Sequence, residues 1–228
     1  MNILIVRLSS LGDIVHTYPM LYDIKTKLEN CTVDWLVDND FAPLVKLNPL
    51  VDNVVSIPLR KWAKNKLTLI PRFLNWRRSI KHKFGSKHYD YIIDSQGLLK
   101  SAILSKCFNG MVVGLGKNSI KEKLATLFYQ HKYEVGSEHL AITKNRLLAA
   151  RILNYTIATN QVNFGLCNLD PIKNIIDEMP STPLLNLTNN KYAIFFHATS
   201  KESKKYPLEK WAALASYIID VHNLDVIL

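Results

Sequence analysis

The sequence predicts an α/β protein built around a parallel β-sheet. Short apolar runs alternate along the chain with longer segments whose apolar residues recur every three or four positions, which is the pattern of strands followed by helices. The chain has 228 residues, which is room for one large domain or two small ones, and its 48% hydrophobic and 21% charged residues are typical of an ordinary soluble protein. No window approaches the ~20 apolar residues of a membrane span, and the N-terminus lacks the layout of a signal peptide, so we expect a cytoplasmic protein.

The N-terminal part of the chain contains the pattern in its clearest form. Ile3–Val6 predicts a strand that enters a turn of small residues, and the apolar spacing after the turn predicts a helix over Ile14–Leu28. The further strands that we expect are Val33–Val37, Val54–Ile57, Tyr91–Asp94 and Val112–Gly114. The further helices that we expect are Trp62–Lys83, Leu98–Phe108, Ile120–Tyr129 and Leu140–Leu153.

A change of composition predicts a boundary after residue 155. Residues 156–190 contain three prolines and many Asn and Thr residues, so we expect them to connect a first domain, residues 1–155, to a second. In residues 191–228 the pattern restarts with a strand at Tyr192–Phe196, a loop, a helix at Leu208–Val221 and the beginning of another strand. A single βαβ unit is small for an independent domain, so we expect the sequence to be truncated within the second domain.

The turn after the first strand ends in Gly12 and Asp13. In an open parallel sheet a strand-to-helix turn lies at the carboxyl edge, where ligands bind, so a carboxylate at position 13 is placed to meet a substrate. A simpler interpretation makes Asp13 the N-cap of the helix and makes Gly12 a residue that the turn needs for a positive φ.

The net charge of +10 comes from one stretch of the sequence. No acidic residue lies between Asp52 and Asp90, and removing the ten basic residues of this stretch from the total of 29 leaves 19, which equals the number of acidic residues. Such a stretch suits nucleic acid, anionic lipid or a phosphorylated substrate, and its interleaved aromatic residues suit base stacking or an interfacial anchor. The alternative without a ligand is a solvated helix face whose aromatic side chains turn inward. The basic residues are Arg60, Lys61, Lys64, Lys66, Arg72, Arg77, Arg78, Lys81, Lys83 and Lys87, and the aromatic residues are Trp62, Phe73 and Trp76.

The three cysteines are odd in number and widely spaced. Cys31, Cys107 and Cys167 therefore suit reduced thiols, and their spacing predicts neither a disulfide framework nor a zinc site. No Asp-x-Asp arrangement suggests a metal site either.

Three separated stretches together resemble one enzyme family. Ile3–Pro19, Tyr89–Ala102 and Phe196–Pro207 are similar to the heptosyltransferase family, glycosyltransferase family 9, which has the GT-B fold, and in particular to its lipopolysaccharide type I members. Leu59–Trp62 and Leu124–Tyr129 also resemble that family. The stretches follow the family's order, and the likeness extends over the whole chain.

The resemblance implies a fold, an activity and partners. It implies a complete N-terminal Rossmann-like domain that binds the acceptor and the beginning of a second one that binds the donor. It further implies inverting transfer of L-glycero-D-manno-heptose from ADP-heptose to the Kdo sugar of Kdo-lipid A, in the synthesis of the lipopolysaccharide inner core. The enzyme would work peripherally at the cytoplasmic face of the inner membrane, with no required cofactor, although a magnesium requirement stays open.

The resemblance also implies roles for individual residues. Asp13 matches the general base, and Lys121 stands where the family tends to have arginine, so the charge is kept but the bidentate fork is lost. The expected acceptor-binding residues are Ser10, Gly12, Arg60, Lys61, Lys64 and Lys121, and the expected donor-binding residues are Thr199, Ser200 and Lys204. We expect His197 to be structural, because it leads out of a buried strand.

Three other functions compete with this one. A sibling enzyme would add a later heptose, although the matches at Tyr89–Ala102 and Arg60–Trp62 favour the first-heptose enzyme. In the family the rest of the donor site lies beyond the point where this sequence ends, so an inactive fragment, or a remnant that binds anionic lipid without catalysis, is a second alternative. A nucleic-acid binder rests on charge and aromatic residues alone, and we expect no nucleic-acid partner.

Overall fold

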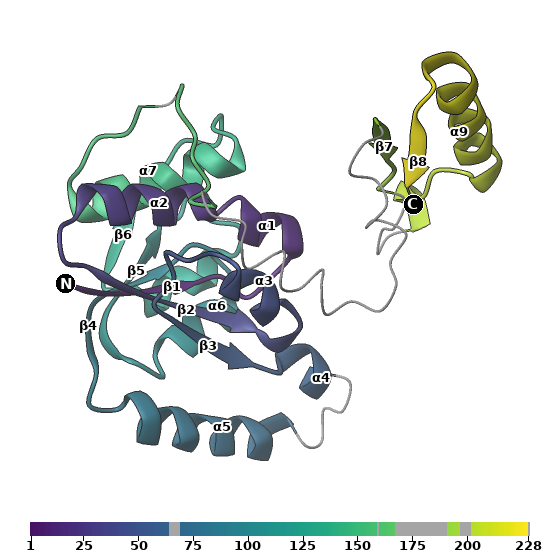
Figure 1. Ribbon diagram of the computed structural model, residues 1–228. Helices are drawn as coiled ribbons and strands as arrows, with labels where there is room; N and C mark the ends of the chain where they lie inside the picture. Colours follow the sequence, from purple (N-terminus) through teal and green to yellow (C-terminus); the bar gives the residue numbers. More distant parts are fainter. Residues whose placement is uncertain (64–68, 159, 167–190, 197–201, 228) are drawn as a thin grey trace. The chain divides into compact units, whose positions relative to one another are not determined.

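The computed structural model describes residues 1–63, 69–158, 160–166, 191–196 and 202–227 (Figure 1). The chain divides into two compact units, Met1–Leu169 and Asp170–Leu228.

The first unit is built on a six-stranded sheet with the order β3-β2-β1-β4-β5-β6. Every neighbouring pair is parallel, which confirms the predicted parallel α/β architecture. This order is that of doubly wound Rossmann-like sheets. Ile3, Leu4, Ile5 and Val6 of the central strand are completely buried, because helices cover both faces of the sheet. The strands are β1 Asn2–Val6, β2 Thr32–Asp38, β3 Asn53–Ile57, β4 His88–Asp94, β5 Asn109–Leu115 and β6 His131–Tyr133.

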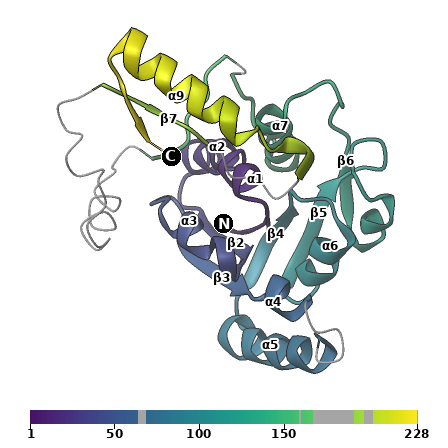
Figure 2. The ribbon, with the colours of Figure 1, turned by 90° about the vertical axis from the view of Figure 1, so that its right-hand side faces the viewer.

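The helices that connect the parallel strands lie on both faces of the sheet (Figure 1). Figures 1 and 2 show α2 and α7 side by side over one face and α5 on the opposite side of the sheet. The α-helices of this unit are α1 Leu11–Val15, α2 Tyr18–Lys27, α3 Ala42–Lys46, α4 Leu59–Ala63, α5 Leu69–Phe84, α6 Leu99–Ser105 and α7 Ala141–Leu153. Two 3₁₀ helices are η1 Asn39–Phe41 and η3 Lys123–Phe128.

Two of the predicted helices differ from the structure. The helix predicted over Ile14–Leu28 is divided into α1 and α2, and the second helix begins with Pro19 in its first turn, where the missing N–H of proline costs nothing. The helix predicted over Ile120–Tyr129 is shorter in the structure, Lys123–Phe128, and is the 3₁₀ helix η3 rather than an α-helix. The sequence pattern also missed α3 and the short polar strand β6.

The first unit extends beyond its expected end at residue 155. Phe164 and Leu166 pack against the core of the unit, and the side-chain amide of Asn48 donates to the carbonyl of Phe164 at 3.0 Å. Most of the expected connection, residues 156–190, lies outside the described residues.

The second unit contains a βαβ element, as the sequence pattern predicts. Strands β7 Tyr192–Ile194 and β8 Asp225–Ile227 are parallel neighbours, and helix α9 Leu208–His222 lies between them in the chain. Phe195 packs against Trp211 of this helix with ring centroids 4.8 Å apart. The 3₁₀ helix η5 Glu202–Lys204 precedes α9.

A buried ion pair joins the two helices on one face of the sheet. The Nε and Nη2 atoms of Arg146 on α7 donate to the carboxylate of Asp23 on α2 at 2.7 and 3.1 Å. Both residues are buried, and the Nη1 atom of Arg146 has no hydrogen-bond partner among the described residues. The pair therefore joins α2 to α7 without satisfying the whole guanidinium group.

Loss of the arginine should destabilise the protein strongly. Arg146→Met leaves the buried carboxylate of Asp23 unpaired, and breaking a buried pair in this way typically costs about 3–5 kcal/mol of the free energy of unfolding. The double variant with Asp23→Leu removes both charges and should recover most of the loss. Urea denaturation followed by circular dichroism measures the effect. Arg151→Met, at an exposed position of the same helix, is the matched control and should change little; an equal loss in both single variants would contradict the role of the ion pair.

Candidate active site at the carboxyl edge of the sheet

The strand order reverses between β1 and β4, so the carboxyl ends of these two strands form a topological switch point. The chain leaves β1 towards β2 on one side and leaves β4 towards β5 on the other, so the two following loops diverge. In open α/β sheets ligands bind at such a switch point, outside the carboxyl ends of the strands.

Arg7, directly after β1, ties the two loops together. Its guanidinium donates from Nη1 to the carbonyl of Ser95 in the loop after β4 at 2.7 Å. The same group lies 3.9 Å from the carboxylate of Asp13 in the other loop. Burial lowers the pKa of Arg7, while Asp13 and Asp94 act to raise it, and an arginine stays charged under all these influences.

The loop after β4 is organised around the buried carboxylate of Asp94. This carboxylate accepts hydrogen bonds from the backbone N–H groups of Gln96 and Gly97 at 3.0 and 3.1 Å, and from the hydroxyls of Ser101 and Tyr129 at 2.8 and 2.7 Å. Burial raises the pKa of Asp94, and the four hydrogen bonds oppose that rise. With its carboxylate enclosed by donors, Asp94 holds the turn in shape and is not available to a ligand.

Gly97 allows a third loop to approach this turn. Its φ of +67° is a conformation that other residues rarely adopt, and a Cβ atom there would lie 2.9 Å from Ile120. The neighbouring Glu122 accepts a hydrogen bond from the backbone of Leu99 at 2.7 Å. The exposed Lys121 therefore lies between two residues that are held against the β4–α6 turn.

Asp13 lies at the third position of α1, with Ser10 as the N-cap. Its carboxylate accepts hydrogen bonds at 3.0 Å from both the backbone N–H and the hydroxyl of Ser10, and 47% of its side chain is exposed. The interpretation of Asp13 as the N-cap is therefore wrong. Partial burial acts to raise the pKa of Asp13, but the bonds from Ser10 and the charges of Arg7 and His16 outweigh it and hold the pKa below its ordinary value.

Gly12 precedes Asp13 and borders open space. It lies within α1 and is not among the glycines with positive φ, so the interpretation of Gly12 as a positive-φ turn residue is wrong. A Cβ atom at this position would meet nothing within 4 Å. No neighbouring group in the described structure thus requires glycine here, although glycine in a helix costs about 1 kcal/mol relative to alanine.

Arg60 lies at the same edge of the sheet, at the ends of β2 and β3. Its backbone N–H donates to the carboxylate of Asp38, the last residue of β2, at 3.0 Å. Its guanidinium stacks on the ring of Phe41 at 4.4 Å from the centroid and lies 4.0 Å from Asp40. The charged group is half-exposed yet restrained in orientation.

The structure brings most of the acceptor-binding residues predicted in the first unit to one edge. Those that follow β1, β3 and β5 at the carboxyl edge are Ser10, Gly12, Arg60, Lys61 and Lys121, and the predicted base Asp13 lies at the same edge. Lys64, Thr199, Ser200 and His197 lie outside the described residues, and of Lys204 only the backbone, in η5, is described. Roles for Arg7 and Asp94 were not predicted, although each is a charged residue directly after an apolar run, Ile3–Val6 and Tyr91–Ile93, which is a usable signal.

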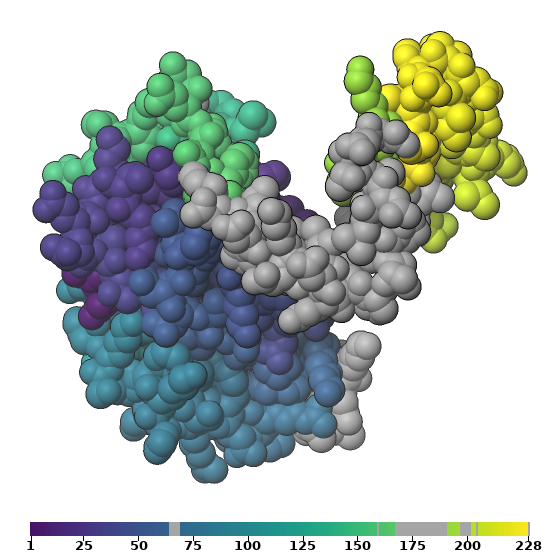
Figure 3. Space-filling view, in the orientation of Figure 1, coloured from purple at the N-terminus to yellow at the C-terminus, as the bar shows by residue number. Residues whose placement is uncertain are grey.

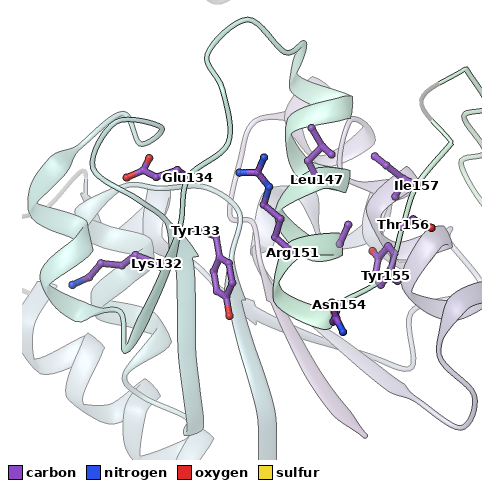
Figure 4. Close-up of a pocket in the computed structure, with 10 residues that line it drawn as sticks. Lys132, Tyr133, Glu134, Leu147, Arg151, Asn154, Tyr155, Thr156 and Ile157 are labelled. Atoms are coloured by element: carbon purple, nitrogen blue, oxygen red, sulfur yellow. The ribbon is translucent and has the colours of Figure 1, made fainter.

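The described residues contain no second site that includes the predicted functional residues. A pocket of about 680 Å³ opens between β6 and the C-terminal part of α7, where Figure 4 shows Arg151, Glu134 and Tyr133 around it, and none of the predicted site residues lines it. No group of three His, Cys, Asp or Glu side chains that could hold a metal ion occurs in the described part of the chain. Burial raises the pKa values of the free thiols of Cys31 and Cys107. None of the described helices combines the length and apolar character that crossing a membrane requires.

Comparison with known proteins identifies relatives of this arrangement. Residues 77–228 match the sequence profile of glycosyltransferase family 9 (heptosyltransferase). Lipopolysaccharide heptosyltransferase 1 of Escherichia coli K12 is 29% identical over 221 residues, which cover 96% of this chain and 65% of the relative. The enzyme of the same name from Pseudomonas aeruginosa PAO1 is 34% identical over 216 residues, which cover 94% of this chain and 57% of the relative. The chain therefore spans less than two thirds of the length of these curated relatives.

Solved structures agree with the sequence comparison. The E. coli heptosyltransferase WaaC with ADP matches with a TM-score of 0.81 and 29% identity, over 99% of this chain and 67% of that one. The same enzyme with ADP-2-deoxy-2-fluoro heptose also matches with a TM-score of 0.81. These matches confirm the predicted resemblance and the predicted fold class.

Removal of the Ser10 hydroxyl should weaken the acidity of Asp13. We expect Ser10→Ala to raise the pKa of Asp13 towards its ordinary value of about 3.9, because one of the bonds to the ionised form is lost. Since the pKa is depressed in the folded state, Asp13 stabilises the fold above its ordinary pKa, and this contribution is lost as the pH falls through the lower folded value. NMR titration of the Asp13 carboxyl carbon measures the shift. Ser9→Ala is the control, and a pKa of Asp13 that Ser10→Ala leaves unmoved would refute the assignment.

Proposed function

This chain belongs to glycosyltransferase family 9, the heptosyltransferases, and we propose that its carboxyl-edge site transfers L-glycero-D-manno-heptose from ADP-heptose to the Kdo sugar of Kdo-lipid A. The observation that carries the proposal is the half-exposed carboxylate of Asp13, held ionised by Arg7 and Ser10 at the switch point of the sheet. The first unit supplies the acceptor side of this proposal, and the chain spans only part of the length of its curated relatives.

In the proposed reaction Asp13 acts as the general base. The acceptor hydroxyl loses its proton to the carboxylate while its oxygen forms a bond to the anomeric carbon of the heptose, and the bond from that carbon to the diphosphate oxygen breaks, with inversion. The low pKa of Asp13 makes it a weak base in the free site. Binding of the acceptor would displace water, and desolvation already acts to raise this pKa, so the bound substrate strengthens the base.

The cations at the same edge would bind the acid groups of the acceptor. Kdo carries a carboxylate, and lipid A carries phosphates. Arg60 offers a guanidinium that stacking on Phe41 has already oriented, which lowers the entropy lost on binding. Lys61, Lys64 and Lys121 would add charge without a bidentate fork. The open space beside Gly12 would let the sugar approach Asp13 closely.

The donor side of the proposal rests on relatives. The E. coli heptosyltransferase was solved with ADP and with an ADP-heptose analogue, which supports ADP-heptose as the donor. We assign Thr199, Ser200 and Lys204 to its diphosphate by their match to the family motif. Cationic groups and backbone N–H groups would then stabilise the departing ADP, and a magnesium ion would be an addition rather than a part of the site.

The relatives also favour the first heptose over a later one. The curated relatives from E. coli and P. aeruginosa both carry the name heptosyltransferase 1. We therefore place the reaction at the first heptose of the lipopolysaccharide inner core, with the protein peripheral to the cytoplasmic face of the inner membrane, where a lipid-linked acceptor would be met.

Neutralising the proposed base should abolish transfer. Asp13→Asn is expected to lower kcat by about 10²–10⁴-fold, because the acceptor proton loses its receiver, while the affinity for ADP stays unchanged. The assay measures ADP release from ADP-heptose with Kdo-lipid A, for this chain and for a chimaera in which the remaining part of the E. coli relative follows Leu228.

The matched control for this assay is Glu29→Gln, which removes an exposed carboxylate from the turn between α2 and β2. A chimaera that keeps its full rate with Asn at position 13 would remove Asp13 from the mechanism. Activity with a different acceptor and none with Kdo-lipid A would reassign the substrate.

The acceptor cations should act on binding more than on chemistry. Arg60→Gln is expected to raise the KM for Kdo-lipid A about tenfold with a smaller change in kcat, since a charge-assisted hydrogen bond to the acceptor is lost. Lys46→Gln, on α3, serves as the control for removal of one positive charge. Steady-state kinetics in the same chimaera measure both, and a fall confined to kcat would contradict the binding role.

A further inference from the structure

Helix α5 has one face packed on the sheet. Phe73 and Trp76 pack against the core of the first unit, and Ile80 is buried in it. The indole of Trp76 donates to the carbonyl of Ser56 at 3.0 Å, and its ring meets the ring of Phe108 edge-on at 6.4 Å. These contacts hold the helix to the protein and determine which of its residues face outwards.

The inward position of the aromatic residues removes one of the expected uses of this segment. Phe73 and Trp76 pack inwards, and Trp62 is buried, so none of the three presents a free ring for base stacking or as an interfacial anchor. Sequence-tolerant binding of single-stranded nucleic acid depends on such exposed rings. The helix keeps its charge but lacks the stacking platform.

The exposed side of α5 combines apolar and cationic groups. Ile70 is 66% exposed and Leu74 is 43% exposed, one helical turn apart on the same side. No acidic residue occurs anywhere in the helix. The exposed basic residues of α5 are Arg72, Arg77, Arg78, Lys81 and Lys83. Helical spacing puts three of them, Arg77, Arg78 and Lys81, on the same side as Ile70 and Leu74, and we call these five residues the outer face of α5.

A small pocket adjoins the outer face. It has a volume of about 270 Å³ and is lined by Arg77 and Lys81 together with the apolar side chains of Ile80, Phe84 and Phe108. No acidic residue lines it. Two cations above an apolar floor suit a phosphate group that is attached to something apolar.

We propose that the outer face of α5 docks the protein on an anionic lipid bilayer. Interfacial helices place apolar side chains at the headgroup boundary and basic side chains against anionic lipid, and both kinds of residue are exposed here. Charge complementarity selects this occupant, because a face with three cations and no acid repels another copy of itself. The inference deepens the proposed function, since a lipid-linked acceptor would bring the chain to a membrane, yet it is measured without any sugar.

The position of α5 makes this docking useful to the candidate site. The helix contacts α4, which carries Arg60 and Lys61 at the carboxyl edge of the sheet. In Figures 1 and 3 it runs along the lower border of the first unit. A bilayer on the outer face of α5 would therefore lie beside the cations assigned to the acceptor.

Vesicle co-sedimentation of the full chain tests the proposal. The vesicles contain phosphatidylglycerol and phosphatidylcholine, or phosphatidylcholine alone, and neither contains Kdo. We expect binding only to the anionic vesicles. Arg78→Glu with Lys81→Glu should lower the partition coefficient by about tenfold or more, because two attractive charges become repulsive. Ile70→Ser with Leu74→Ser should weaken binding most at high salt, where the electrostatic part is screened.

The matched control is Lys27→Glu with Arg151→Glu, which makes the same change of net charge at exposed positions of α2 and α7, on the opposite side of the sheet. Circular dichroism melting verifies that each variant is folded. An equal loss in the control pair, equal binding to neutral vesicles, or absence of binding by the unaltered chain would overturn the proposal. Preference for a DNA or RNA oligonucleotide over anionic vesicles would overturn it as well. Because no sugar is present, failure here leaves the proposed transfer reaction standing, and failure of that reaction leaves this result standing.

Discussion

The guanidinium of Arg7 is the constraint on which the candidate site depends. It is buried at the end of the central strand, donates at 2.7 Å to the carbonyl of Ser95 and lies 3.9 Å from the carboxylate of Asp13. One charged group thus sets the spacing between two loops that the topology otherwise sends in opposite directions. A buried cation is costly unless its donors are satisfied, so the two loops have to take positions that supply acceptors. The same requirement leaves the carboxylate of Asp13 facing outwards and ionised.

The strands were predictable because their apolar runs are continuous. Strands buried on both faces contain almost no polar residue, so Ile3–Val6 and Tyr91–Asp94 were recognisable without knowledge of their partners. The segment Ile120–Tyr129 was not, because its conformation depends on distant groups. Tyr129 bonds to Asp94, and Ile120 lies against Gly97, and neither contact leaves a trace in the local spacing. The division between α1 and α2 was missed for a similar reason, since the pattern of apolar residues runs through it.

In the candidate site, too, the local sequence predicted where a residue lies, whereas its contacts depend on the tertiary structure. Asp13 was identified from a turn that follows a strand, and its place at the carboxyl edge follows from the parallel sheet. Its hydrogen bonds, its low pKa and its partner Arg7 depend on how two loops meet. The basic stretch was visible as composition, but only the structure separates its parts. Arg60 and Lys61 lie at the carboxyl edge, α5 turns its aromatic residues inwards, and its cations remain outside with Ile70 and Leu74.

The close approach of Ile120 to Gly97 links the turn after β4 to the neighbouring residue Lys121. A methyl group at position 97 would lie 2.9 Å from the side chain of Ile120, which is too close for a carbon–carbon contact. The side chain of Ile120 would therefore have to move, and the positive φ at position 97 would add backbone strain. Lys121 is the next residue, so a displacement that reaches the backbone of Ile120 would also move Lys121. With Lys121 in its proposed acceptor-binding role, a substitution at position 97 would change acceptor preference without contacting the acceptor.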